Sequence, residues 1–150
     1  MQISDILSKS DVFVDQKATS KKQVLEQLAH LASSATKLDE RLIFDALLER
    51  ERLGTTGVGR GVALPHARLT DLKKIYCAFL KTNPLDFEAV DEKNVDLIFL
   101  LLVPEDAGAD HLKALARLSK LLRDEDVANQ LRTASSVADL YKIILENDVD

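Results

Sequence analysis

Hydrophobic residues recur at helical spacing in two stretches of the first third of the chain. The spacing of Ser20 and Gln23 is that of a capping box, and Asp39 is a suitable cap for a second helix that Gly54 ends. The apolar positions of the two stretches are Val24, Leu25, Leu28, Leu31 and Ala32, and then Leu42, Ile43, Ala46 and Leu47. The pattern predicts two consecutive amphipathic helices.

Two continuous apolar runs, residues 75–80 and 95–103, have the length of strands. Asn83-Pro84 and the acidic residues around Asp91 separate them, and residues 12–14 form a third short apolar stretch. Uninterrupted apolar runs of this length are typical of strands covered on both faces. We therefore expect a buried sheet.

The last third of the chain returns to helical spacing. Asp110 is a candidate N-cap, and a final helix is expected to begin near Ser135 or Ser136 and to fray over residues 146–150. The apolar positions are Leu112, Leu115, Ala116, Leu118, Leu121 and Leu122, then Val137, Leu140, Ile143 and Ile144. Helices outside buried strands predict an α/β fold, and no flexible linker divides residues 1–150, so a single domain is expected.

Composition and charge remove several functional classes. The 150 residues are 46% hydrophobic and carry a net charge of −5, which excludes a disordered chain and argues against a general nucleic-acid binder. Cys77 is the only cysteine, so no intramolecular disulfide or thiolate metal cluster is expected. The start lacks a signal-peptide pattern, and the longest apolar run, 97–103, is too short to cross a bilayer. These features predict a cytoplasmic protein without membrane insertion.

Four of the five glycines fall within residues 54–68. Closely spaced glycines allow tight turns and direct backbone amides at an anion, although a loop beside a glycine-containing strand edge explains them equally well. No Gly-Lys pair occurs, so a P-loop is excluded. Val62 and Leu64 stand where a dinucleotide fingerprint requires glycine, which excludes that motif too.

His66 ends this segment behind Pro65, which restrains the backbone that presents it. A histidine held in this way can accept a phosphoryl group, abstract a proton or bind a metal. His111 follows the candidate cap Asp110, where the helix dipole favours a neutral imidazole. The remaining histidine, His30, is assigned to a helix boundary or C-terminal dipole role.

The neighbours of His66 distinguish the possible reactions. A metal site with His66, His111 and Asp110 lacks a recognisable ligand spacing, and a serine hydrolase lacks a nucleophile elbow. No cofactor or metal is therefore expected. Phosphoryl acceptance requires cationic, hydroxyl and amide donors, which the sequence supplies nearby. These donors are Arg50, Thr55, Thr56 and the amides of Gly57 and Gly59. The competing explanation for Arg50 is a solvated arginine in the last turn of the second helix.

Residues 48–59 and the following Gly61-Val62-Ala63-Leu64-Pro65-His66 resemble the type-2 enzyme IIA family of the bacterial phosphoenolpyruvate-dependent phosphotransferase system. Residues 84–87, 95–104 and 110–112 extend the resemblance over nearly the whole chain. The length and the first seven residues are most similar to the nitrogen-regulatory IIA branch.

The resemblance implies a mixed sheet flanked by helices, the phosphotransferase/anion-transport-like IIA fold. It also implies that His66 is phosphorylated on Nε2, with Arg50 and His111 lining the site. A histidine-containing phosphocarrier protein would be the donor, and transporters or sensor kinases of nitrogen and potassium metabolism would be the regulated partners. Arg60 departs from the family pattern, and we expect an extra cation beside the site that tightens phosphate binding or shifts partner choice.

Three alternatives remain at this point. The chain can be a detached sugar-transport IIA that passes phosphate to a IIB domain, or a non-enzymatic interaction module. A metal-dependent hydrolase would contain stoichiometric metal. For docking a phosphocarrier, the expected apolar surface is Val62, Leu64 and Leu69, with core packing as the competing explanation for all three.

Overall fold

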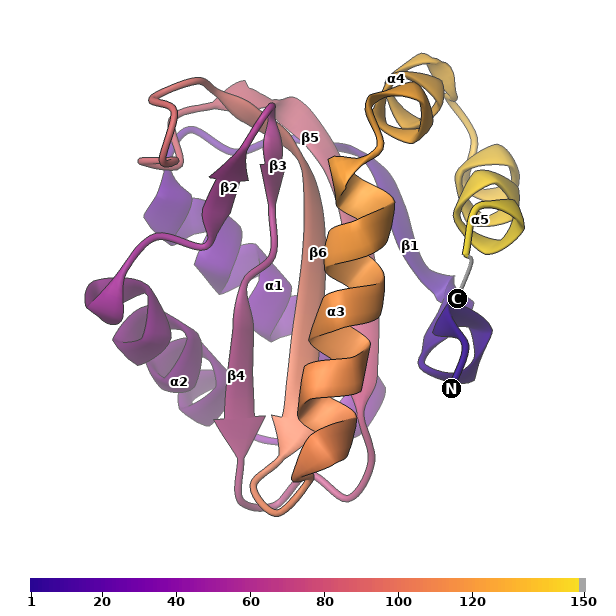
Figure 1. Cartoon of the computed structure of the whole chain (residues 1–150). Helices are drawn as coiled ribbons and strands as arrows, with labels where there is room; N and C mark the ends of the chain where they lie inside the picture. Colours follow the sequence, from indigo (N-terminus) through magenta and orange to yellow (C-terminus); the bar gives the residue numbers. More distant parts are fainter. Residues whose placement is uncertain (149–150) are drawn as a thin grey trace.

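The computed structural model describes residues 1–148 and contains a mixed β-sheet with helices on both faces (Figure 1). Along the sheet the order is β1 (Leu7–Gln16), β5 (Tyr76–Leu85), β6 (Val95–Pro104), β3 (Val62–Ala63) and β2 (Gly57–Gly59). Strand β4 (His66–Leu69) pairs with β6 beyond β3. The β5/β6 and β2/β3 pairs are antiparallel, and the remaining pairs are parallel. The α/β architecture expected from the sequence is confirmed.

Strand β6 forms the centre of the sheet and explains the longest apolar run. Successive side chains of a strand point to opposite faces, and both faces of β6 are covered. Ile98, Leu100 and Leu102 belong to one buried cluster, whereas Phe99 and Leu101 belong to the other. Burial on both sides replaces the alternating pattern by continuous hydrophobicity.

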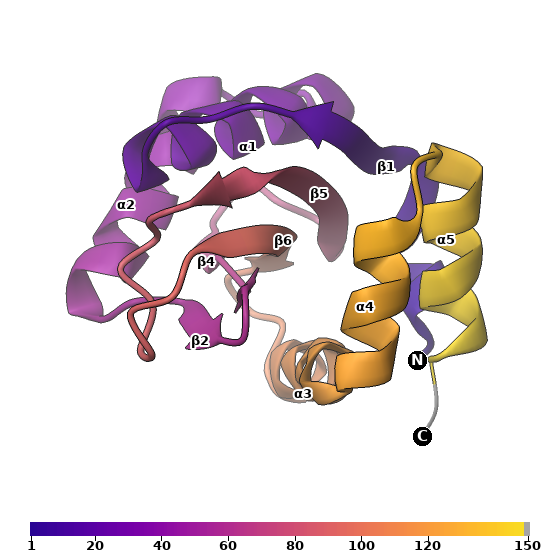
Figure 2. The same ribbon diagram turned by 90° about the horizontal axis from the view of Figure 1, so that it is seen from above.

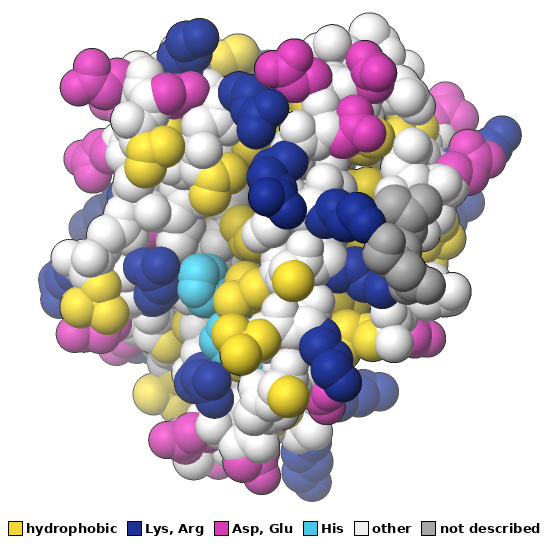
Figure 3. Space-filling model, in the orientation of Figure 1, with side chains coloured by type: hydrophobic (Ala, Val, Ile, Leu, Met, Phe, Trp, Pro, Cys, Tyr) yellow, Lys and Arg dark blue, Asp and Glu magenta, His cyan; other side chains and the backbone are white. Residues whose placement is uncertain are grey.

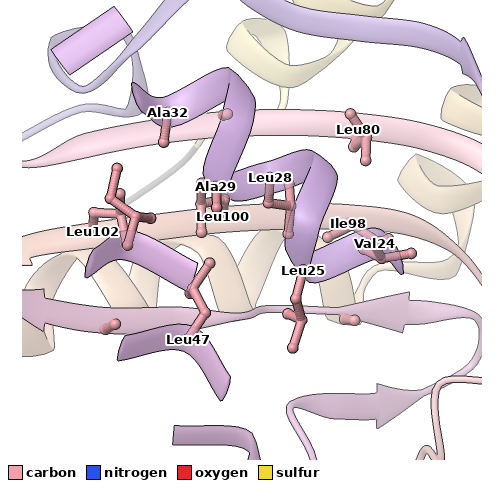
Figure 4. Packing of buried hydrophobic residues seen from close by; sticks show 14 of the residues in the cluster. Val24, Leu25, Leu28, Ala29, Ala32, Leu47, Leu80, Ile98, Leu100 and Leu102 are labelled. Atoms are coloured by element: carbon pink, nitrogen blue, oxygen red, sulfur yellow. The ribbon is translucent and has the colours of Figure 1, made fainter. Parts of the chain in front are cut away.

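Helices α1 (Lys21–Thr36) and α2 (Glu40–Leu53) cover the first face. Their expected caps are confirmed, because the Ser20 side chain accepts a hydrogen bond from the Gln23 amide and the Asp39 side chain accepts one from the Arg41 amide. Leu42 was expected on the apolar face but is 56% exposed. Figure 4 shows how buried side chains of α1 and of Leu47 in α2 pack against Leu80 of β5 and against Ile98, Leu100 and Leu102 of β6.

Helices α3 (Ala109–Arg123), α4 (Glu125–Thr133) and α5 (Val137–Glu146) lie on the other side of the sheet (Figure 2). The N-cap of α3 is Gly108, not the predicted Asp110, which lies in the first helical turn. Gly108 has φ +58 and ψ −125, a conformation that glycine adopts without a side-chain penalty. Leu112 was predicted to be buried but is 69% exposed.

Several element boundaries differ from the predicted ones. The predicted separator Asn83-Pro84 lies inside β5, where an irregular register between Lys81 and Leu85 accommodates a residue without an amide hydrogen. Strand β1 extends well beyond residues 12–14. No helix within residues 1–148 is long and apolar enough to cross a membrane.

Helix α5 ends at Glu146, where fraying was expected, but Asp148 beyond it is held in place beside the 3-10 helix η1 (Ile3–Asp5) and α3. Helix η1 presents its Ile3 amide to the Asp148 carboxylate at 2.7 Å. Arg117 Nε donates to the same carboxylate at 2.6 Å. Residues 149 and 150 of the predicted frayed segment lie outside the described residues.

Candidate functional site

His66 is the first residue of β4, at an interruption of the sheet. Strands β3 and β4 run in sequence along the same side of β6, and the break between them falls at Leu64-Pro65. The Pro65 carbonyl still accepts a hydrogen bond from Leu101 at 3.0 Å, which keeps the break short. His66 pairs with Leu101, whose side chain packs in the cluster beneath α3. The break thus presents His66 at the edge of a rigid sheet.

The hydrogen-bond partners of His66 define its tautomer. Nδ1 lies 2.9 Å from the Leu64 carbonyl oxygen, which can only accept a hydrogen bond. Arg50 Nε, which can only donate, lies 3.3 Å from Nε2. Both contacts require the proton on Nδ1 and the lone pair on Nε2. Nε2 is therefore the ring nitrogen that keeps a lone pair.

Arg50 reaches His66 from the last turn of α2. Its Nη1 donates to the Gly54 carbonyl at 3.0 Å, at a helix end where cations are favoured by the dipole. That bond holds the guanidinium while Nε approaches the imidazole. The structure therefore places Arg50 against the His66 ring, with its guanidinium bonded to the protein and not only to solvent.

His111 approaches His66 from the first turn of α3. The two ring centroids are 5.9 Å apart, with the planes at 87°. His111 is only 9% exposed, and its Nδ1 has no hydrogen-bond partner among residues 1–148. A buried polar atom without a partner carries a desolvation penalty.

The surroundings keep both histidines neutral near pH 7. Burial, as the largest cause, lowers the pKa of His66 below 6.5; Arg50 lowers it further, while the Leu64 carbonyl and Glu51 raise it. Burial also lowers the pKa of His111, with smaller contributions from Arg68 and His66. A neutral imidazole keeps the lone pair that a nucleophile requires.

The other predicted phosphate donors use their polar groups within the protein. Thr55 Oγ1 donates to the Phe87 carbonyl at 3.3 Å and accepts from the Gly57 amide at 3.0 Å. The Thr56 amide lies 3.2 Å from both Glu51 carboxylate oxygens, and its hydroxyl also donates to that carboxylate. Gly59 pairs with β3. No contact among the described residues brings these four residues onto His66.

Arg60 does not lie beside His66, contrary to the expectation. Its Nη1 donates to the Arg123 carbonyl at 3.2 Å and lies 3.6 Å from a Glu125 oxygen, at the end of α3. His111 is at the start of α3, about 18 Å away along the helix axis. Arg60 therefore contributes to helix packing rather than to the site.

Sequence reasoning missed two charged residues near His66. Arg68 lies two positions further along β4, on the same side of the strand, and lowers the pKa of His111. The alternation of side chains along a strand could therefore have indicated that Arg68 lies on the same face as His66. Glu51 lies beside Arg50 and binds Thr56, but no local pattern distinguishes it from its neighbour Glu49.

The predicted apolar docking residues belong to the core. Val62, Leu64 and Leu69 are all buried, so core packing is the correct explanation for them. Exposed hydrophobic side chains instead include Leu53 at the end of α2, Val58 in β2, Val90 beside β2 and Leu112 next to His111. Figure 3 shows histidine side chains on this surface between basic and hydrophobic ones.

Comparison with known proteins defines the class of this fold and site. The chain is similar to a nitrogen regulatory protein of Bradyrhizobium diazoefficiens, 48% identical over 96% of this chain and 95% of that protein. The chain is also similar to a fructose-specific EIIA component of Haloferax volcanii, 38% identical over 96% of this chain and 95% of that protein. The crystal structure of nitrogen regulatory protein IIA-Ntr from Neisseria meningitidis superimposes with a TM-score of 0.90 at 38% identity, covering 95% of this chain and 98% of that one. The class is thus the IIA-type α/β domain.

A family model assigns the chain within this class. The model of the phosphoenolpyruvate-dependent sugar phosphotransferase system, EIIA 2, matches residues 5–147. The chain belongs to this family, as the resemblance predicted.

Proposed function

We propose that this protein is a phosphorelay component that accepts a phosphoryl group on His66 from a histidine-containing phosphocarrier and regulates partner proteins according to its phosphorylation state. The observation that carries the proposal is the pair of contacts on the His66 ring. The Leu64 carbonyl oxygen lies 2.9 Å from Nδ1, and Arg50 Nε lies 3.3 Å from Nε2. A phosphoryl group on Nε2 would meet a cation already in position.

The transfer step requires no net proton exchange with solvent. The Nε2 lone pair of His66 attacks phosphorus as the phosphorus–nitrogen bond of the donor phosphohistidine breaks, and the donor imidazole leaves with that electron pair. The Nδ1 proton stays on His66, hydrogen-bonded to Leu64. Since one nitrogen replaces another on phosphorus, positioning and charge stabilisation account for the catalysis.

Three side chains are suited to stabilise the transferring oxygens. Arg50 supplies directed N–H donors, and Arg68 adds positive potential beside His111. His111 has a buried ring nitrogen without a partner among the described residues, which a phosphoryl oxygen would satisfy. We assign Thr55, Thr56, Gly57 and Gly59 to the support of the loop that holds Arg50.

The phosphocarrier would dock on the exposed hydrophobic side chains near His66. Leu112 directly follows His111, and Val58 lies in β2. Val90 lies beside that strand because its amide donates to the Gly57 carbonyl at 3.1 Å. Isolated apolar residues next to a polar site are the usual composition of a transient protein interface.

The regulatory part of the proposal rests on the names of the relatives. The Bradyrhizobium relative is called a nitrogen regulatory protein, as is the Neisseria structure. By analogy, the partners are transporters or sensor kinases of nitrogen or potassium metabolism. Phosphorylation adds about −1.5 to −2 charges at the site surface, enough to alter an electrostatic interface. Neither nucleic-acid binding nor membrane insertion forms part of this function.

A second candidate is sugar transport. The fructose-specific EIIA relative from Haloferax volcanii matches the same share of both chains as the Bradyrhizobium relative, at 38% identity. In that case His66 would pass its phosphoryl group to a IIB domain. Mixing the phosphorylated protein with IIB domains and following the transfer of phosphate distinguishes the two roles.

The decisive experiment is phosphorylation in a reconstituted relay. The native protein and His66→Ala are incubated with phosphoenolpyruvate, enzyme I and a phosphocarrier from either the sugar or the nitrogen branch. Intact mass and acid-labile phosphate are then measured. One phosphoryl group on the native chain and none on the variant is the expected result. No transfer from either phosphocarrier would leave the interaction module as the better function.

A further inference from the structure

Two adjacent residues at the end of α2 hold the loop that follows it from both sides. Arg50 Nη1 donates to the Gly54 carbonyl at 3.0 Å. The Glu51 carboxylate accepts hydrogen bonds from the amide and hydroxyl of Thr56. The Gly54 amide also donates to the Glu51 carbonyl at 3.2 Å. The acceptor that orients Arg50 is thus part of a loop that Glu51 restrains.

Glu51 occupies a position where a carboxylate is unfavourable. Its side chain is only 4% exposed, and it lies in the last turn of α2, where the helix dipole disfavours an anion. The cost is offset by Lys21 Nζ at 2.6 Å, which comes from the first turn of α1 and is itself 15% exposed. Burial and the helix dipole both disfavour a carboxylate at this position, which lies beside His66. A residue retained against both effects indicates selection for function.

We infer that Glu51 is a positioning residue for phosphoryl acceptance at His66, acting through Thr56 and the loop at residues 54–56 to hold Arg50 against the imidazole. The inference rests on the proposed function. Glu51 touches neither His66 nor the transferring group. It restrains the loop whose Gly54 carbonyl orients the guanidinium of Arg50. Because Arg50 is already in position, the reaction does not pay the entropy cost of ordering it.

The charge of Glu51 has a second, measurable effect. Glu51 raises the pKa of His66, in opposition to the effect of Arg50. Removing only the negative charge lowers the pKa of His66, whereas release of Arg50 from the imidazole raises it, and Arg50 has the larger effect of the two. A Glu51→Gln variant that releases Arg50 should therefore show a higher His66 pKa, and a folded variant that keeps Arg50 in place a lower one.

The test compares Glu51→Gln with Glu49→Gln. Glu49 lies in the same part of α2, but its side chain is 72% exposed and forms an ion pair with Arg52 at 3.7 Å. Rates of phosphoryl acceptance are measured against phosphocarrier concentration, together with the His66 pKa from ring-proton NMR and with urea unfolding. Misplacing a donor by about 1 Å can cost ~10²-fold in rate, so we expect kcat of Glu51→Gln to fall about 10- to 100-fold.

The expected pattern separates positioning from folding. KM for the phosphocarrier should stay unchanged in Glu51→Gln because the docking residues are untouched. The His66 pKa should rise because Arg50 is released. Glu49→Gln should match the native protein. Thr56→Val should slow transfer because it removes the hydroxyl bonded to Glu51, and Thr56→Ser should restore it. The Thr56 pair carries the test if Glu51→Gln does not fold.

Two failures remain distinguishable. A native protein that accepts no phosphate overturns the proposed function itself. A native protein that accepts phosphate, together with folded Glu51→Gln and Thr56→Val variants of native kcat, overturns only the positioning role of Glu51.

Discussion

The glycine-rich segment contributes to two polar networks that differ in how completely their atoms are paired. At Arg60 and Gly61, Arg132 Nε contacts both Asp96 oxygens at 3.1 and 2.9 Å, and Arg132 Nη2 donates to the Arg60 carbonyl at 2.7 Å. The Arg60 amide donates to Asp91 at 2.8 Å. At the other end, His66 and His111 form the network, and the buried Nδ1 of His111 has no partner within residues 1–148.

The difference separates a structural network from a site that is prepared for a ligand. Paired buried groups contribute to stability, whereas an unpaired buried nitrogen costs free energy until something binds it. The first network fixes α4 against the β3–β6 region. Under the proposed function, the unpaired nitrogen of the second network is the group that a phosphoryl oxygen would satisfy. Substitutions in the two networks should therefore affect different quantities, stability in one and transfer in the other.

The largest effect is expected from Gly61→Ala in the structural network. Gly61 has φ +82, and an added Cβ would lie 2.3 Å from Arg132 Nη2 and 3.0 Å from Asp96 Oδ1. Backbone strain and overpacking together should lower the free energy of unfolding by about 2 to 5 kcal/mol. Urea unfolding measures this loss.

Gly108→Ala is the matched control for the close approach. Gly108 also has a positive φ, +58, but its nearest atom lies 4.0 Å from the built Cβ. It should therefore lose less stability than Gly61→Ala. Equal losses in both variants would show that backbone conformation, and not contact with Arg132 and Asp96, controls the stability of this turn.

The sequence predicts the parts of the site that depend on local patterns. The segment ending in Pro65-His66 indicates the candidate phosphoryl acceptor, and Arg50 stands at a helix end that Gly54 already indicates. The ion pair between Lys21 and Glu51 joins two helices at 2.6 Å without any shared periodicity. Such long-range pairing is fixed by the packing of α1 on α2, which the residue pattern alone does not specify.

The same distinction applies to the fold. Caps at Ser20 and Asp39 and the continuous run in β6 follow from side-chain chemistry and burial, and were predictable. Asp110 was a reasonable cap by residue type, but the turn geometry at Gly108 determines where α3 begins. Arg60 looked like a site cation by sequence proximity, yet the β2–β3 turn directs it to the end of α3.

The next effect compares two arginines of the same segment. Arg50→Ala removes a donor aimed at Nε2 and should slow phosphoryl acceptance about 10²- to 10³-fold. Arg60→Ala removes contacts at the far end of α3 and should leave the rate of acceptance unchanged. Rapid-quench assays with the same phosphocarrier measure both rates. A slow Arg60→Ala variant of native stability would mean that the two networks are coupled.

A smaller effect on transfer, with an opposite effect on stability, is expected from His111→Leu. The substitution removes a buried nitrogen that lacks a partner among the described residues, so stability should stay the same or rise by up to about 1 kcal/mol. Transfer should slow about 10- to 100-fold because one stabilising donor is lost. Thermal unfolding and the relay assay give the two quantities. Loss of stability without loss of rate would instead assign His111 to the structural class.

The smallest effect is a pH dependence that both histidines share. Their pKa values lie below 6.5 in the folded protein, mainly because of burial, while the unfolded chain keeps the ordinary value. Between the two values the unfolded chain binds more protons, so stability falls as the pH drops from above 6.5 through the lowered pKa values. Protonation of His66 removes the Nε2 lone pair, so the rate of acceptance should fall in the same direction. Ring-proton NMR should give midpoints below 6.5 for both residues, and His111→Leu should retain only part of the stability change. Midpoints at or above 6.5 would contradict the neutral, pre-positioned imidazole on which the contrast between the two networks depends.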